Sequence, residues 1–261
     1  MALRRRPRHR LRHRHHHANT DVLAEMKGVC MFFAWLVGMS LSVLCCLFCT
    51  PTAFAETILD GTWKIERPRA ILEPINGTVP FTPKARKHYQ ANKRAHDSGH
   101  YDYDLVQTLC ATPGLPRLML TPDRFHIWQR PELITFQFEW NRLFYQVDMT
   151  DRAIEPLLVG VNTGESQGQW QGDTLVIKTN NFTDQTLIDS LVPHSDEMKL
   201  TQRFRLLDSN TLEDRITVED PQTFTRPWEA MVRYSRQPDA PFPENMCIDR
   251  RNAGKLPLPP K

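Results

Sequence analysis

From residue 115 onward the chain consists of short segments in which apolar and polar residues alternate, and this alternation constrains the fold more than any other feature. In residues 132–140, ELITFQFEW, every second residue from Ile134 to Trp140 is apolar and those between them are polar. A period of two is typical of an antiparallel strand with one buried face. Comparable segments are RFHIWQ (124–129), RLFYQVDM (142–149), GQWQGDTLVIKT (168–179), KLTQRFRLL (199–207), TLEDRITVE (211–219) and WEAMVRYSR (228–236). We therefore predict a mainly β fold.

These strands follow one another through short turns, and the unpaired edges of such a sheet need protection. Closing the sheet on itself hides the edges most completely. We therefore predict that residues 56–261 form a single domain, an antiparallel up-and-down β-barrel of about 8–10 strands. The alternative is an open β-sandwich.

One peripheral helix is expected before the strands. Thr82 can cap it, Pro83 suits its first position, and Gly99 suits its end. The segment between them is strongly polar, so the helix should lie on the outside of the domain. Its few inward contacts are expected to be Ala85, Tyr89 and Ala95.

Residues 28–49, GVCMFFAWLVGMSLSVLCCLFC, are almost entirely apolar and carry no charge. Lys27 precedes them, and the small residues Ala53 and Ala55 follow, which is the order of a secretory signal peptide. We predict a signal peptide over residues 26–55, cleavage after Ala55, and a periplasmic or secreted mature protein that touches the membrane only before cleavage. Because about 20 apolar residues can span a bilayer, the alternative is an inner-membrane anchor.

Residues 1–25 form a leader rich in Arg and His. Met26 and Lys27 follow at once and make an ordinary signal-peptide start. Met26 is therefore a candidate initiator, in which case the leader is not translated. The alternative roles of this leader are nucleic-acid binding through its charge, or metal binding by His15, His16 and His17.

The positive charge of the whole chain comes from its N-terminal part. The chain has 33 Lys and Arg against 30 Asp and Glu, and eight of these bases but only two of the acids lie in residues 1–55. The remainder holds 25 bases and 28 acids, a net charge of −3. We therefore expect no nucleic-acid partner for the mature protein.

Four of the six cysteines lie in residues 1–55, which leaves Cys110 and Cys247. Two cysteines in an exported protein indicate one disulfide. The alternative is a pair of unpaired buried thiols. No CxxC spacing occurs in the mature part, and we expect no metal site.

Several motifs run in order through most of residues 60–250. They are CATPGLPRLML (110–120), GQWQGDTLVIKTNNF (168–182), PHSDEMKLTQRFR (193–205), VEDPQTFTRPW (218–228) and the late Cys247. In these motifs the chain resembles a family of uncharacterised secreted bacterial proteins whose expected fold is a lipocalin-like, or calycin-like, β-barrel. The resemblance implies that fold, but no activity, because the family has no settled biochemical role.

The PHSD motif places His194, Ser195 and Asp196 on a loop before a strand, where a scaffold can present reactive groups. A histidine exchanges protons near neutral pH, and a carboxylate can orient it. His194 and Asp196 are therefore candidate catalytic residues. The alternative is a turn in which Ser195 or Asp196 bonds the backbone.

His126 lies in the middle of a predicted strand, with Trp128 on the same face. It is the third catalytic candidate, and Trp128 is a candidate ligand contact. This face meets a ligand if it lines the barrel interior and is solvated if it points outward, because alternation shows two faces without telling which is inside. The same ambiguity applies to the other candidate ligand-binding residues, which are Glu139, Tyr145, Arg203 and Arg205.

Three functions remain open at this level. The first is the binding of a small apolar or aromatic molecule in a barrel cavity. The second is a cofactor-free lyase, isomerase or hydrolase with His194 or His126 as acid/base. The third is an envelope accessory protein without chemistry. No phosphate loop or dinucleotide fingerprint occurs, so we expect no cofactor; the oligomeric state stays open.

Overall fold

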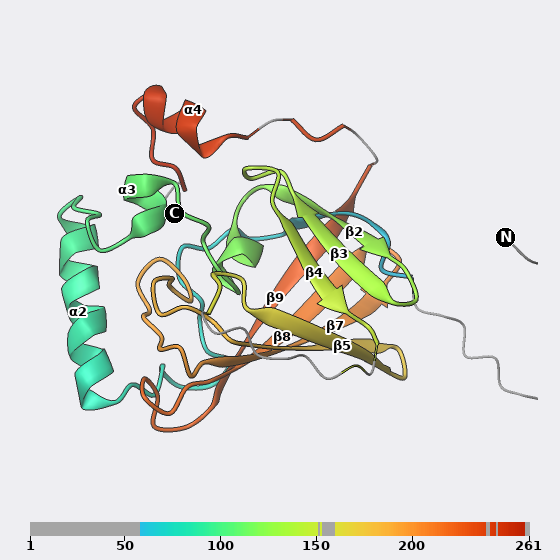
Figure 1. Ribbon diagram of the computed structural model, residues 1–261, viewed down its shortest axis with the longest axis horizontal. Helices are drawn as coiled ribbons and strands as arrows, with labels where there is room; N and C mark the ends of the chain where they lie inside the picture. The colour runs from blue at the N-terminus through green and yellow to red at the C-terminus, as the bar shows by residue number, and fades with distance from the viewer. Residues whose placement is uncertain (1–57, 151, 153–159, 239–240, 244, 259–261) are drawn as a thin grey trace, which may run out of the picture. The chain divides into compact units, whose positions relative to one another are not determined.

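Nine strands among the described residues close into one barrel (Figure 1). The computed structural model describes residues 58–258 except 151, 153–159, 239–240 and 244. The strands are β1 (Gly61–Ile65), β2 (Arg124–Gln129), β3 (Leu133–Phe138), β4 (Phe144–Asp148), β5 (Glu165–Gln171), β6 (Thr174–Asn180), β7 (Lys199–Asp208), β8 (Thr211–Glu219) and β9 (Trp228–Gln237). The predicted mainly β barrel is confirmed, and the open-sandwich alternative is wrong.

The predicted leader (1–25), the signal peptide (26–55) and its cleavage site after Ala55 lie outside the described residues. Within the part of the chain that is described, no helix is both long and apolar enough to cross a membrane.

Neighbouring strands run antiparallel around the barrel except β4 and β5, which are parallel. A closed ring with an odd number of strands cannot alternate direction all the way round, so at least one parallel pair is required. This pair is short, because only Asp148 and Gln167 are partners in it. The sequence pattern predicts the strands but not this exception.

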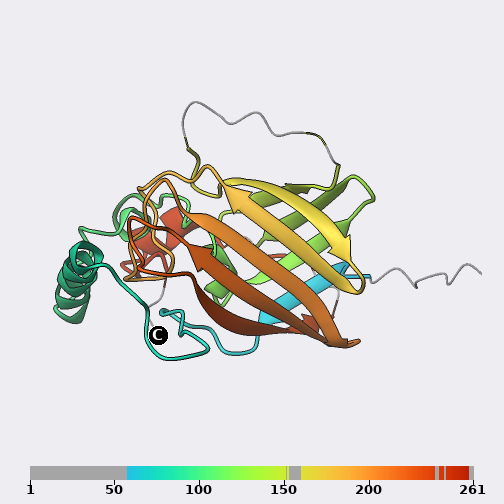
Figure 2. The same cartoon turned by 90° about the horizontal axis from the view of Figure 1, so that it is seen from below.

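The barrel interior is filled by large side chains from alternate strand positions. The ring centroids of Phe125 on β2 and Tyr234 on β9 are 5.0 Å apart. Those of Phe136 on β3 and Phe204 on β7 are 5.5 Å apart. All four side chains are at most 2% exposed, so rings from separate parts of the wall meet inside the barrel. Figure 2 shows the strands curving around this interior.

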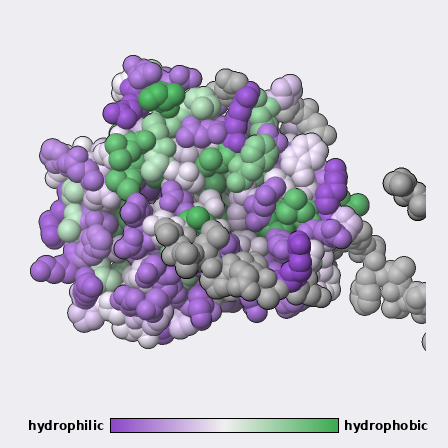
Figure 3. Space-filling view, in the orientation of Figure 1, coloured by the Kyte–Doolittle hydropathy of each residue, from purple (hydrophilic) through white to green (hydrophobic). Residues whose placement is uncertain are grey.

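The helices of the described residues lie beside the barrel rather than in its wall (Figures 1 and 2). They are α2 (Pro83–Asp97), α3 (Leu105–Leu109), α4 (Cys247–Asn252) and a 3₁₀ turn over Arg117–Leu120. As predicted, Thr82 caps α2, since its Oγ1 accepts a hydrogen bond from Ala85 N at 3.3 Å. The surface over α2 is largely hydrophilic (Figure 3), as its composition requires.

A disulfide joins Cys110, directly after α3, to Cys247, the first residue of α4. Their Cα atoms are 5.8 Å apart. The predicted single disulfide is confirmed, and the alternative of two unpaired thiols is wrong.

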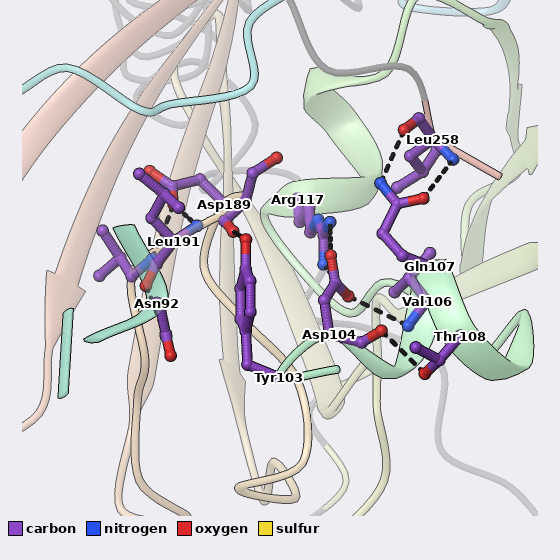
Figure 4. A network of polar contacts seen from close by, with 12 residues as sticks. Asn92, Tyr103, Asp104, Val106, Gln107, Thr108, Arg117, Asp189, Leu191 and Leu258 are labelled. Atoms are coloured by element: carbon purple, nitrogen blue, oxygen red, sulfur yellow. Dashed lines mark hydrogen bonds and ion pairs between the residues drawn. The ribbon is translucent and has the colours of Figure 1, made fainter. Parts of the chain in front are cut away.

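A buried polar network attaches α3 to the neighbouring loops (Figure 4). The Arg117 guanidinium donates to both carboxylate oxygens of Asp104, at 2.9 and 2.6 Å. Asp104 also caps α3 by accepting from Val106 N at 3.0 Å, and Tyr103 OH donates to Ser190 O at 3.0 Å. A buried ion pair needs such additional hydrogen bonds to offset its desolvation.

Candidate functional site

A pocket of about 850 Å³ lies at one rim of the barrel, where β1, β2, β3 and β9 come together. The strand register brings its outer-wall residues together: Thr62 on β1 and Gln137 on β3 both stand opposite His126 on β2. Side chains of directly opposed residues share one face of a sheet. Asp60, Trp128, Arg236 and Phe242 also line the pocket.

One ring nitrogen of His126 has a hydrogen-bond partner among the described residues, and the other has none. Its Nδ1 lies 2.9 Å from Thr62 Oγ1, within hydrogen-bond distance. Its Nε2 is buried, has no hydrogen-bond partner among the described residues, and lies 3.6 Å from Asp60 Oδ1. That separation is too long for a direct hydrogen bond. The imidazole is therefore oriented by Thr62 and faces a carboxylate that it does not bond.

Asp60 precedes β1 and is tied to the wall through two of its oxygens. Its Oδ2 accepts from Gln129 N at 3.1 Å, and its backbone carbonyl accepts from Arg236 Nη1 at 2.7 Å. Arg236 also donates from Nε to Ser209 O at 2.8 Å, and its guanidinium lies 4.2 Å from the Trp63 ring centroid. Arg236 thus covers the buried Trp63 ring at this rim, and Asp60 lines the pocket beside it.

Aromatic rings form the other part of the pocket. The Trp128 ring centroid lies 4.1 Å from that of His126, and Trp128 is 42% exposed. Its Nε1 donates to Gln137 Oε1 at 3.2 Å, which fixes the orientation of the indole. Phe242 stands near His126, with ring centroids 6.4 Å apart. A large, exposed ring with its polar edge satisfied offers a planar molecule a surface for stacking.

The structure settles which face of each strand is inside. His126 and Trp128 lie on the outer wall, as do the exposed Arg203 and Arg205. Tyr145 points into the interior, where its OH donates to Ser166 Oγ at 2.7 Å. Burial raises the pKa of Tyr145 to about 12.

Glu139 is buried directly after β3 and accepts hydrogen bonds from Arg124. Its Oε2 accepts from the backbone N of Arg124 at 2.9 Å, and its Oε1 accepts from the Arg124 guanidinium. The carboxylate of Glu139 therefore connects the start of β2 to the end of β3.

His194 lines a different pocket, of about 530 Å³, between α2 and the PHSD loop, with the exposed Asp196. His194 Nδ1 donates to Ser195 O at 2.8 Å, since a carbonyl can only accept, and Nε2 lies 2.8 Å from Thr186 Oγ1. Burial lowers the pKa of His194, which favours the neutral ring. Both ring nitrogens are thus engaged within the loop.

The hydroxyl of Ser195 bonds Asp220, from the motif VEDPQTFTRPW, rather than the His194 ring. Its Oγ donates to Asp220 Oδ1 at 2.8 Å, and its backbone N donates to Oδ2 at 2.7 Å. Ser195 Oγ also accepts from Glu197 N at 3.1 Å, which makes the local turn expected as the alternative for PHSD. The candidate histidines His194 and His126 therefore line separate pockets.

A polar cluster that the sequence reasoning missed lies inside the barrel. Gln202 Nε2 donates to Asp214 Oδ2 at 2.7 Å, while Asp214 Oδ1, Gln202 Oε1 and the OH of Tyr234 have no partner among the described residues. Burial raises the pKa of Asp214 to about 8. The sequence does indicate that Asp214 is buried, because it shares the apolar face of its strand with Leu212 and Ile216.

No group of three or more His, Cys, Asp or Glu among the described residues is arranged to hold a metal ion.

Comparisons with known proteins give no family for this chain. No family model matches it, and no curated protein matches it. Among solved structures it is similar to crystal structures of two single-site mutants of the fluorescent protein UnaG. Each is 15% identical and covers 69% of this chain and 97% of its own, with TM-scores of 0.32 and 0.31. At these values the similarity assigns neither a family nor a function.

Proposed function

We propose that this protein is an exported binding protein for a small aromatic molecule, which it holds in the rim pocket between Trp128 and Asp60. The observation that carries the proposal is the pocket of about 850 Å³ in which an indole 42% exposed stands beside an imidazole and a carboxylate. Ligand sites are commonly concave, of about 300–1,000 Å³, with aromatic walls and a few polar groups.

The packing of the barrel supports the rim pocket over the interior as the binding site. Phe136 and Phe204 meet inside the barrel and are fully buried. A ligand there would have to displace close-packed rings, at the cost of their mutual contacts. In the rim pocket the ligand covers the exposed face of Trp128 instead.

Calorimetric titration of the purified protein with 4-cyanophenol and 4-methoxybenzonitrile tests this function. We expect Trp128→Ala to weaken the binding of both compounds by about tenfold or more, because the stacking surface is lost. Phe144→Ala is the matched control, since Phe144 is an aromatic residue of β4, 59% exposed and outside the pocket lining. Equal affinity of the Trp128→Ala variant and the native protein would place the ligand elsewhere.

Export rests on the order of features in residues 26–55, where Lys27 precedes the apolar run and the small residues Ala53 and Ala55 follow it. The N-terminal sequence of the protein recovered from the producing cells should begin at Glu56. A protein that retains residues 28–49 would show that a membrane-anchored form replaces the exported one.

A further inference from the structure

At the polar end of the rim pocket, two side-chain atoms make no hydrogen bond to another described residue. Asp60 uses Oδ2 and its backbone carbonyl to bind Gln129 and Arg236. Oδ1 has no hydrogen bond to another described residue and belongs to a side chain that is 36% exposed. His126 uses Nδ1 with Thr62 and leaves Nε2, 3.6 Å from Asp60 Oδ1. A carboxylate oxygen is only an acceptor, whereas the imidazole nitrogen either donates or accepts.

From this arrangement we infer that the ligand of the rim pocket is a hydroxyaryl compound, whose hydroxyl donates to Asp60 Oδ1 while its ring stacks on Trp128. This inference rests on the proposed function and names the chemical class of its ligand. An aryl hydroxyl carries a proton to donate, so it can supply the hydrogen bond that Asp60 Oδ1 lacks among the described residues. His126 Nε2 is buried and Asp60 is partly exposed, so Asp60 Oδ1 is the atom that the hydroxyl contacts.

A ligand that bonds Asp60 through its hydroxyl has its ring beside Trp128, His126 and Phe242. His126 lies between the two contacts, with Nε2 3.6 Å from Asp60 Oδ1 and its ring centroid 4.1 Å from that of Trp128, so a molecule bound at Asp60 Oδ1 also reaches the indole. Phe242 lies 6.4 Å from His126 between ring centroids and bounds the site on a further side. Stacking and a hydrogen bond at one end of the ring are thus available at the same time.

The charges around the pocket favour a neutral ligand. The Asp60 carboxylate repels an anion at the position of the hydroxyl. The Arg236 guanidinium, bonded to the backbone carbonyl of Asp60, offsets the attraction of that carboxylate for a cation. An ether has no proton to donate, so it leaves Asp60 Oδ1 without a partner and loses part of its binding energy. A phenol meets each of these conditions.

The test compares 4-cyanophenol with its methyl ether, 4-methoxybenzonitrile, and with 4-cyanobenzoate, at a pH at which the phenol is neutral. On the native protein we expect the phenol to bind about tenfold or more tighter than the ether, as for the loss of one charge-assisted hydrogen bond. Asp60→Asn should reduce this preference to about threefold or less. Asp173→Asn, an exposed acid in the turn between β5 and β6, is the matched control and should leave it unchanged.

Each other outcome has a definite meaning. If the phenol and the ether bind with equal affinity, and both depend on Trp128, the binding function stands and recognition of the hydroxyl is overturned. Tighter binding of 4-cyanobenzoate overturns it in favour of recognition of an anion. If none of the three compounds binds, both the proposed binding function and the recognition of the hydroxyl are overturned. The native-protein comparison decides the question even if the Asp60→Asn variant does not fold.

Discussion

At the scale of single residues, Asp214 is a buried acid in a barrel wall that otherwise faces a largely apolar interior. Its burial raises its pKa from 3.8 to about 8, and Gln202 supplies its one hydrogen bond between side chains. The carboxyl group is therefore protonated at neutral pH in the folded protein and ionised in the unfolded chain. Burial of a neutral acid costs much less than burial of a charge.

This difference predicts how stability depends on pH. The folded state retains a proton that the unfolded chain has lost between its pKa of 3.8 and the folded value of about 8. The contribution of Asp214 to stability is therefore complete below the unfolded pKa and is lost as pH rises through the folded one, by up to about 1.4 kcal/mol per pH unit. Asp214→Asn should flatten this decline, as urea unfolding of both proteins across that range will measure. If the free energy of unfolding depends on pH in the same way for both proteins, the raised pKa of Asp214 is contradicted.

The candidate site residues show how little a residue type says about its role. Glu139 is a candidate ligand contact in the sequence and Ser195 lies in the PHSD motif, yet Glu139 binds Arg124 and Ser195 binds Asp220. His126 Nε2 has no hydrogen-bond partner in the described part of the chain, whereas both nitrogens of His194 are engaged. The partners of Glu139, Ser195 and His126 lie 15, 25 and 64 residues away along the chain, and the sequence cannot place them.

At the scale of elements, α2 shows what local rules predict and what they omit. Its start at Pro83, its cap at Thr82 and the burial of Ala85 follow from local chemistry and were predicted. The buried Asn92 was not, because its Nδ2 donates to Leu191 O, at 2.9 Å, on a loop almost a hundred residues away. A polar residue on a polar helix gives no sign of such a contact.

Asn92 should therefore contribute more to stability than its neighbours on α2. Asn92→Ala removes the donor to a buried carbonyl, and we expect a loss of about 1–3 kcal/mol in the free energy of unfolding. The exposed Gln90 provides the control, since Gln90→Ala should change it by less than about 0.5 kcal/mol. Urea denaturation of the two variants makes the comparison. Similar small losses for both would show that the bond to Leu191 is not important.

At the scale of the whole molecule, the disulfide closes a very long loop. Cys110 and Cys247 are 137 residues apart, and β2 to β9 all lie between them. In the chain-entropy model, closing a loop of this length stabilises the folded state by about 4–5 kcal/mol, because the unfolded chain is restricted. The bond thus acts on the entire barrel rather than on the two short helices that it joins.

Removal of this bond should consequently destabilise the whole barrel. The double variant Cys110→Ser, Cys247→Ser is expected to unfold at much lower urea than the native protein, with a loss approaching about 4–5 kcal/mol. A reducing agent should shift the native protein in the same direction and leave the double variant unchanged. Equal unfolding midpoints of the oxidised and reduced native protein would contradict this.

The sequence alone determined the strand segments, the helix at residue 83, the closed mainly β fold and the pairing of the two cysteines, because these follow from periodicity, local capping and composition. Only the tertiary structure decided which face of β2 is inside, since alternation is symmetric between the two faces until the barrel closes. Closure also fixed the parallel β4–β5 pair and brought Asp60 to His126. The rim pocket belongs to this second group, because its residues come from three separate segments of the chain, at 60–62, 126–137 and 236–242, and meet only where β1, β2 and β9 are neighbours.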